Sequence, residues 1–190
     1  MELNLNTDND RRTILGRKLL LLAIRGQHLK AVKKLLAHGV GNNFVNAVDG
    51  KALFIASSIT NDGTSSSLEI MKELVNHGAD IATHYERCLT SASAAGNLEV
   101  VKFILDQQKL LTKKDDKQSS DDTLWLAIKY AQDNGHLNVL KLLFKEVKID
   151  DNMKRNDRLL SVTAAGNLEY VKRLLNEGAD IHTSIEVTYN

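Results

Sequence analysis

The sequence contains no proline and only one cysteine, Cys88, in 190 residues. A single cysteine excludes an intramolecular disulfide and any cysteine-rich zinc site. Aromatic residues make up only 5% of the chain, so its core must be built from leucine, valine, isoleucine and alanine. This composition favours close-packed helices over a β-sandwich, whose strands are enriched in aromatic and β-branched residues.

The chain also lacks a charge excess, a long apolar run and a secretory signal. Its 25 basic and 24 acidic side chains leave a net charge of +1, whereas nucleic-acid binding through phosphate contacts usually requires a basic excess. The longest apolar run, residues 19–24, is far too short to span a bilayer. The first ten residues are acidic and rich in asparagine, unlike a secretory signal. We therefore expect a cytoplasmic or nuclear protein that binds neither nucleic acid nor a membrane.

What the chain does contain is one helical pattern, repeated five times. Each copy opens with a leucine. Apolar residues follow three, six and seven positions after this leucine, and a lysine follows four positions after it. The opening leucines are Leu29, Leu68, Leu98, Leu137 and Leu168. Their residue numbers differ by 39, 30, 39 and 31. Self-similarity at such a period indicates a stacked array, in which no unit buries its apolar face alone.

The five lysines fall opposite the centre of the apolar stripe. They are Lys33, Lys72, Lys102, Lys141 and Lys172. Lysine stems cover neighbouring apolar surface while their charged ends stay in water. We expect these side chains to form a solvated outer edge of the array.

A shorter helix with small residues near its end is predicted before each copy. Small residues let antiparallel helices approach closely, and glycine permits the turn between them. This glycine is Gly96, Gly135 and Gly166 in the last three units and lies one position earlier, at Gly26, in the first. In the second unit an insertion, residues 58–67, replaces it.

Glycine also follows the second helix of three units, where it predicts a left-handed C-cap. These glycines are Gly39, Gly78 and Gly178. His38 and His77 precede two of them. At a helix end such histidines are expected to hydrogen-bond the last carbonyl groups and to complement the helix dipole.

These patterns resemble the ankyrin-repeat family, whose unit of about 33 residues is a helix–turn–helix. The chain reads G-N-L-E-V-V-K-F-I-L from Gly96, G-H-L-N-V-L-K-L-L-F from Gly135 and G-N-L-E-Y-V-K-R-L-L-N-E-G-A-D-I from Gly166. The resemblance covers roughly residues 18–183. Short G-A-D-I joints and the absence of T-P-L-H resemble the divergent ankyrin repeat proteins of giant DNA viruses, such as mimivirus, although intracellular bacteria also carry divergent arrays.

The resemblance implies an all-α solenoid of about five stacked helix–turn–helix units. The predicted units are residues 17–46, 47–82, 83–112, 123–152 and 153–183, between an N-terminal tail or cap at 1–16 and a C-terminal tail at 184–190. We expect a cap helix to begin near Arg11. Residues 58–67 and 107–122 are predicted to be exposed loops. The apolar face of the last helix pair is expected to be covered by residues 185–187 or by something outside this chain.

No constellation of residues indicates catalysis. The histidines lack the i, i+4 spacing of a zinc helix, and no nucleophile elbow or phosphate loop is present. Cys88 has no activating base nearby in the sequence, so a packed or half-exposed thiol is expected rather than a nucleophile. We predict that the protein is not an enzyme and has no cofactor, no metal and no small-molecule substrate. A small enzyme that uses a histidine is the weakest alternative.

The resemblance implies that the protein binds another protein through a concave face formed by first helices and joint tips. The candidate partner-binding residues are Trp125, Glu86, His84, Arg17, Asp133, Asn134 and Lys154. Trp125 either anchors a partner or packs under residues 107–122. For a viral or effector protein, the resemblance implies a host protein as partner and the interior of the host cell as the location. The alternative is a structural or adaptor protein that self-associates through a thinly capped C-terminal unit.

Overall fold

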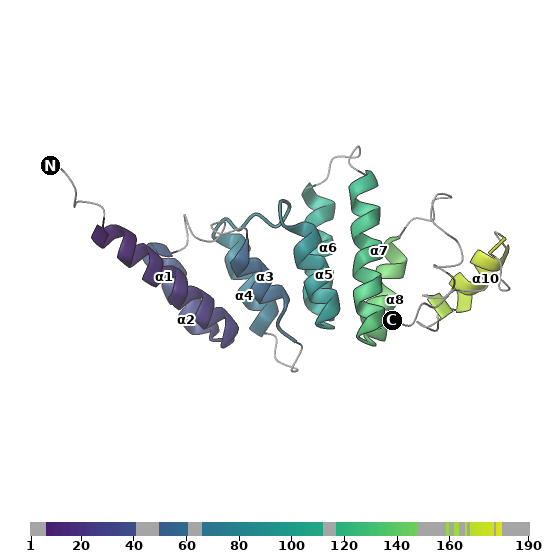
Figure 1. Ribbon diagram of the computed structural model, residues 1–190, viewed down its shortest axis with the longest axis horizontal. Helices are drawn as coiled ribbons and strands as arrows, with labels where there is room; N and C mark the ends of the chain where they lie inside the picture. The colour runs from purple at the N-terminus through teal and green to yellow at the C-terminus, as the bar shows by residue number, and fades with distance from the viewer. Residues whose placement is uncertain are drawn as a thin grey trace, which may run out of the picture.

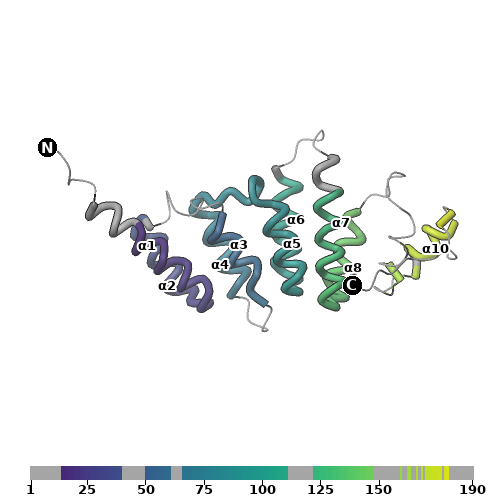
Figure 2. The backbone as a smooth tube through the Cα atoms, viewed as in Figure 1, coloured from purple at the N-terminus to yellow at the C-terminus, as the bar shows by residue number. Residues whose placement is uncertain are grey.

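The structure, a computed structural model, describes most of the chain (Figure 2). Residues 7–40, 50–60, 66–111 and 117–147 are described continuously. In the last unit it describes residues 159, 162–163, 166, 168–176 and 178–179. Lys154 and residues 185–187, which figured in the sequence predictions, lie outside the described residues.

The helices form two layers (Figure 1). The first layer contains α1 (Thr7–Arg25), α3 (Lys51–Ser57), α5 (Tyr85–Ala94) and α7 (Lys117–Asp133). The second contains α2 (Leu29–Leu35), α4 (Ser66–Asn76), α6 (Leu98–Leu111) and α8 (Leu137–Glu146). A π-helical turn, η1 (Leu36–Val40), extends α2, and α10 (Leu168–Asn176) lies at the far end of the row.

The helices pack in a regular order, both within each pair and between neighbouring pairs. Each first-layer helix packs against the second-layer helix that follows it in the chain, and within each layer every helix from α1 to α8 packs against its neighbours in the row. In Figure 1 the two helices of a pair run antiparallel, and the α4–α5 connection lies on the edge opposite the α5–α6 turn. The predicted all-α solenoid of stacked helix pairs is confirmed.

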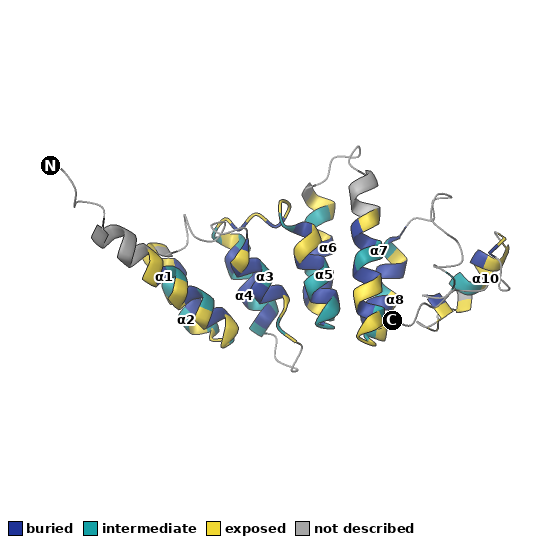
Figure 3. Ribbon diagram, in the orientation of Figure 1, coloured by how far each residue is buried: buried dark blue, intermediate teal, exposed yellow. Residues whose placement is uncertain are grey.

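The core is a continuous aliphatic strip between the two layers (Figure 3). Within the repeated pattern, the apolar residues three, six and seven positions after the opening leucine supply it: Val101, Ile104 and Leu105 are almost fully buried. The opening leucine contributes less than its spacing predicts, since Leu137 is 50% exposed. The lysine four positions after the opening leucine is solvated as predicted. In the third unit this is Lys102, whose side chain is 46% exposed.

The turn inside each helix pair keeps its conformation even where its glycine moves. Gly96 has φ +70° and is the second residue before the opening leucine. In the first unit the residue with positive φ is Gln27, at +55°, and not Gly26. A left-handed backbone costs a residue with a Cβ about 1–2 kcal/mol. Gly26 lies within the turn as predicted, but Gln27, at the position that Gly96 holds in its own unit, takes the left-handed conformation.

The C-caps of the second helices are confirmed. All three predicted cap glycines have φ between +79° and +89°. At Gly78 the amide of Ala79 donates to the Leu74 carbonyl at 3.0 Å and that of Gly78 to the Val75 carbonyl at 2.9 Å, which is a Schellman motif. Just before these glycines, His38 Nδ1 lies 2.8 Å from the Lys34 carbonyl oxygen. His77 Nδ1 lies 2.9 Å from that of Glu73.

Helices extend into two segments for which the sequence predicted other structure. α6 continues to Leu111 and α7 begins at Lys117, so most of residues 107–122 is helical and the predicted loop is wrong. Glutamine, lysine and leucine are good helix formers, and this propensity outweighs the polarity that suggested a loop. At the N-terminus, α1 begins at Thr7, four residues before Arg11, and runs without a break to Arg25.

Candidate functional site

Three of the candidate residues occupy one repeated position, twelve residues before the opening leucine. They are Arg17 on α1, Glu86 on α5 and Trp125 on α7. Glu86, in the first turn of α5, is exposed, whereas Arg17 and Trp125 are half-buried. Because α5 packs directly against α7, the structure places Glu86 and Trp125 at matching positions on neighbouring helices. Arg17 lies two helices away from Glu86 in the same layer.

Trp125 packs on the second helix of its own unit. Its ring meets Phe144 of α8 edge-on, with centroids 6.3 Å apart. Phe144 is in turn 5.7 Å from the ring of Tyr170 on α10. Edge-to-face aromatic pairs add about 0.5–1.5 kcal/mol to the burial of their surface. Trp125 therefore holds α7 to α8, and the prediction that it packs under a loop at residues 107–122 is wrong because helices occupy most of that stretch.

His84 serves the packing between units. It precedes α5, is half-buried, and stands against Gly50, the residue before α3. A Cβ at Gly50 would come within 2.3 Å of the His84 ring, which shows how closely the two joints approach. We therefore assign His84 to the junction between the second and third units and remove it from the candidate contact residues.

The joint before α5, which is the connection between α4 and α5 at residues 77–84, is ordered by hydrogen bonds between its own residues. Asp80 accepts a hydrogen bond from the Thr83 hydroxyl and another, at 3.1 Å, from the Thr83 amide. These bonds, the hydroxyl's first, hold the pKa of the Asp80 carboxyl below its ordinary value of 3.8. The carboxylate is therefore ionised at neutral pH and fixes the joint tip in one conformation.

A second group of candidates lies at the other end of α7. Asp133 ends the helix and Asn134 follows it, and both are exposed. The Asn134 amide donates to the Tyr130 carbonyl at 2.8 Å, which holds its side chain over the helix end. Tyr130 itself is 43% exposed. These three residues place one aromatic ring beside polar groups on the surface of the first-helix layer.

Tyr130 was missed by the sequence predictions, although a signal for it exists. It stands seven residues before its opening leucine, where the third and fifth units have Ser91 and Ser161. An aromatic residue where two other units have serine is a departure from the repeat. The rarity of tryptophan drew attention to Trp125 instead.

Hydrogen bonds link neighbouring units near the turns that join the two helices of each pair. Asn97, which is buried, donates to Ser67 Oγ at 2.7 Å and to the Ile59 carbonyl at 3.3 Å, both in the preceding unit. At the same position in the next unit, His136 Nε2 lies 3.0 Å from the Ala94 carbonyl oxygen. The residue before the opening leucine therefore ties each of these units to the one before it.

The described residues contain few groups with unusual chemistry. Cys88 is fully buried, and burial raises the pKa of its thiol to about 12, so it remains protonated at neutral pH. In the parts of the chain that the structure describes, no group of three or more His, Cys, Asp or Glu side chains could hold a metal ion. Among those same residues no helix is both long and apolar enough to cross a membrane. The arrangement is thus a fixed, mainly polar surface of helix faces and joint tips.

Comparison with known proteins agrees with this geometry. The family described as ankyrin repeats in three copies matches the chain over residues 20–115 and 89–185. A putative ankyrin repeat protein of Acanthamoeba polyphaga mimivirus is 48% identical over 33 residues, which is 17% of this chain and 25% of the viral protein. This chain therefore spans only a quarter of that relative's length. The predicted resemblance to viral ankyrin repeats is confirmed, and the chain belongs to the ankyrin-repeat family.

Proposed function

We propose that the protein binds another protein through the exposed face of its first-helix layer, around α5 and α7. Ankyrin repeats are protein–protein interaction modules and are generally scaffolds without catalytic activity. The observation that carries the proposal is the exposed group Glu86, Tyr130, Asp133 and Asn134, which two neighbouring helices present on one layer. Tyrosine is a frequent anchor of interfaces because it combines a large apolar ring with a hydroxyl group.

The rigidity of the scaffold supports this function. The contacts of Asn97 and His136 with preceding units and the ordered Asp80–Thr83 joint fix the surface before a partner arrives. A preordered surface loses little conformational entropy on binding, so more of the contact energy appears as affinity. Units at residues 17–46, 47–82, 83–112, 123–152 and 153–183 are the proposed building blocks of this scaffold.

Site-specific photocrosslinking tests which layer contacts the partner. A benzophenone amino acid replaces Tyr130 or Glu86, and matched control variants carry it at Lys102 of α6 or Lys145 of α8, which are exposed on the second layer. The extract comes from Acanthamoeba cells, because the viral relative takes its name from a virus of that host. We expect the same protein to crosslink to positions 130 and 86 and not to the controls. Equal crosslinking from both layers would contradict the proposal.

Self-association through the last unit is the second candidate. Leu168 and Leu175 of α10 are 64% and 40% exposed, which leaves apolar surface at this end of the array. Sedimentation velocity over a hundredfold range of concentration tests it, with a Leu175→Ser variant for comparison. A single monomeric species throughout would remove this candidate.

A further inference from the structure

The first unit is strongly basic, although the net charge of the whole chain is only +1. Residues 11–48 contain eight arginines and lysines and no acidic residue. On α1 and α2, Lys18, Arg25, Lys30 and Lys34 are exposed, and within the described part of the chain no acidic side chain pairs with them. Lys33 is different, since it lies 3.1 Å from Glu73 of the next unit.

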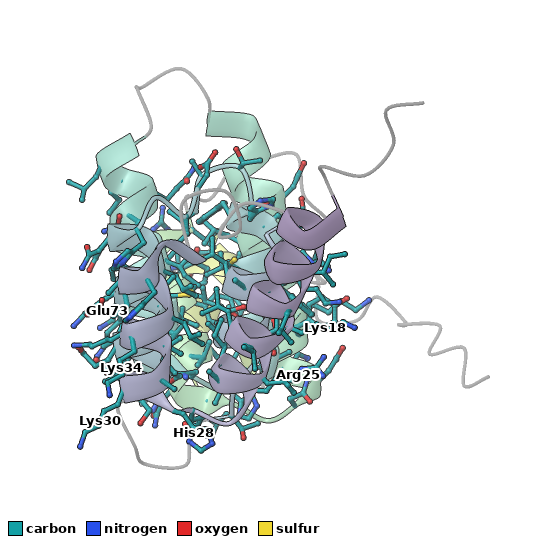
Figure 4. All side chains as sticks on the ribbon, turned by 90° about the vertical axis from the view of Figure 1, so that its left-hand side faces the viewer. Lys18, Arg25, His28, Lys30, Lys34 and Glu73 are labelled. Carbon is teal, nitrogen blue, oxygen red and sulfur yellow. The ribbon has the colours of Figure 1, made fainter. Side chains whose placement is uncertain are left out.

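Figure 4 shows the array from the N-terminal end and places these charges on two sides of the first helix pair. Lys18 and Arg25 project on the α1 side, and Lys30 and Lys34 project on the α2 side. The basic side chains therefore flank the end of the solenoid, at the place where a further unit would stack.

Exposed leucines occupy α1 between these charges. Leu15, Leu19 and Leu22 are 57%, 44% and 62% exposed. Their i, i+4 and i+7 spacing puts them on one face of the helix. Within the described residues no element covers these leucines, whereas a polar outer face is what keeps the end of a repeat array soluble.

Equivalent positions in the third unit show what this stripe faces. Counting back from the opening leucine, Leu19 corresponds to Cys88 and Leu15 to His84. Cys88 is covered by α3 of the preceding unit, next to Ser57, and His84 stands against Gly50 of that unit. Leu15 and Leu19 therefore face the space in front of the first unit, which no described residue fills. Leu22 corresponds to Tyr130, which is 43% exposed although α5 precedes it, so Leu22 lies at the edge of this end face.

We propose that this end face, consisting of Leu15, Leu19 and Leu22 flanked by Lys18, Arg25, Lys30 and Lys34, docks an acidic amphipathic helix of another protein. The repeat geometry indicates a helix, because the same face of α3 is covered by α1 and that of α5 by α3. The stripe spans about 10 Å along the helix axis, so two to three turns of a partner would cover it. Apolar residues of the partner would meet the leucines, and glutamates or aspartates at its flanks would pair with the four basic side chains.

Charge argues against another copy of this chain as the occupant. Two N-terminal end faces would bring like charges together, which is unfavourable in a desolvated contact. The charged side chains of α10 that the structure describes, Lys172 and Arg173, are also basic. An acidic helix complements both the apolar stripe and the charges around it.

The test uses a fluorescein-labelled synthetic helix of about 16 residues, with leucines at i, i+3, i+4 and i+7 and glutamates on both flanks. A control peptide has the same leucines with lysine in place of every glutamate. Fluorescence anisotropy with the full chain measures both affinities. We expect the acidic peptide to bind about tenfold or more tightly than the basic one, and its affinity to fall as salt is added.

Variants of the chain locate the site. Leu15→Ser/Leu22→Ser and Lys18→Glu/Arg25→Glu should each weaken binding about tenfold or more. The matched controls, Leu110→Ser/Leu137→Ser and Lys102→Glu/Lys145→Glu, change equally exposed residues elsewhere and should alter it less than about twofold. Circular dichroism shows that each variant stays folded.

Four results would overturn the proposal. The first is equal binding of the acidic and basic peptides, and the second is acidic binding that the end-face variants leave unchanged. The third is a concentration-dependent dimer that Leu15→Ser/Leu22→Ser abolishes, which would make a second copy the occupant. The fourth is preferential binding, through the same residues, to vesicles with anionic lipid or to duplex DNA. Crosslinking at Glu86 and Tyr130 probes α5 and α7 and not the first unit, so the two proposals fail independently.

Discussion

Cys88 in α5 and Leu19 in α1 occupy the same position of the repeat, ten residues before their opening leucines. Cys88 is fully buried, because α3 of the preceding unit covers it, whereas the larger and more apolar Leu19 is 44% exposed. Burial at this position therefore depends on the neighbouring unit and not on the residue or on its own helix pair. In a solenoid the interior of the array and its end can use identical local structure for packing in one case and for a free surface in the other.

The largest expected effect of this contrast is on thiol reactivity. With its pKa raised to about 12 from an ordinary 9.0, Cys88 should react with a thiol reagent at pH 8 about a thousandfold more slowly in the native chain than in the urea-unfolded chain. Leu19→Cys in a Cys88→Ser background provides the matched control and should react nearly as fast as a free thiol. Native Cys88 reacting as fast as the unfolded chain would contradict the burial described here.

The same thiol has a consequence for the pH dependence of stability. Folding raises the pKa of Cys88, so the protonated thiol contributes fully to stability below pH 9 and this contribution is lost as the pH rises towards 12. Urea unfolding of the wild type and of Cys88→Ser at pH 8 and pH 10 measures it. The wild type should lose more stability than the variant between these two values.

Introducing a charge at Cys88 and at Leu19 compares the two positions by its effect on the free energy of unfolding. Cys88→Asp should lower the free energy of unfolding by about 3–5 kcal/mol, because burial between α5 and α3 would remove the carboxylate from water. Leu19→Asp, at the equivalent half-exposed position, should lower it by only about 1–1.5 kcal/mol, from the partial burial and helix propensity that leucine provides. Urea denaturation followed by circular dichroism measures both. Similar losses for the two variants would mean that α1 is covered as α5 is.

Substitutions at two turn glycines test whether a side chain of the next unit restricts the turn. Gly96 and Gly135 have φ of +70° and +73°, but only at Gly96 would a Cβ meet a neighbour, the His136 ring at 2.4 Å. We expect Gly96→Ala to cost about 2–3 kcal/mol and Gly135→Ala about 1 kcal/mol in thermal or urea unfolding. Adding His136→Ala should recover part of the loss at Gly96 and none at Gly135. Equal costs for the two glycines would show that the His136 ring does not constrain the turn.

The smallest effect concerns the residue before the opening leucine. Asn97→Ala removes the hydrogen bonds that Asn97 donates to Ser67 and to the Ile59 carbonyl, and the one that it accepts from the Val100 amide. It should cost about 1–2 kcal/mol of stability. His28 holds the same position in the first unit but is exposed, so His28→Ala should cost less than about 0.5 kcal/mol. Equilibrium unfolding of the two variants measures the difference, and an equal cost would argue against a role for Asn97 in joining units.

Much of the fold could be predicted because its signals are local and repeated. The offsets within each copy identified the core residues Val101, Ile104 and Leu105, and the glycines marked the C-caps at Gly39, Gly78 and Gly178. The extension of α6 and α7 was missed because the polar composition of residues 107–122 suggested a loop, although most of them are good helix formers.

The candidate surface was predicted less well than the fold. Glu86, Asp133 and Asn134 are exposed as a contact surface requires, and Lys154 lies outside the described residues. Trp125 and His84 turned out to pack against Phe144 and Gly50. Nothing in the residues around either one shows this, because both neighbours come from other helices. A repeat position indicates which layer a residue belongs to, but not whether another element covers it.

The sequence by itself determined that this chain is a row of helix pairs, since a period, an apolar stripe and cap glycines are properties of each unit alone. Only the tertiary structure decided that Cys88 is enclosed while Leu19 is open, and that Gln27 and not Gly26 takes the left-handed conformation in the first turn. Exposure and turn position depend on helices that pack from other parts of the chain, and these contacts are not encoded in any one repeat. The basic, leucine-bearing end of the array became visible only when each unit was placed beside its neighbour.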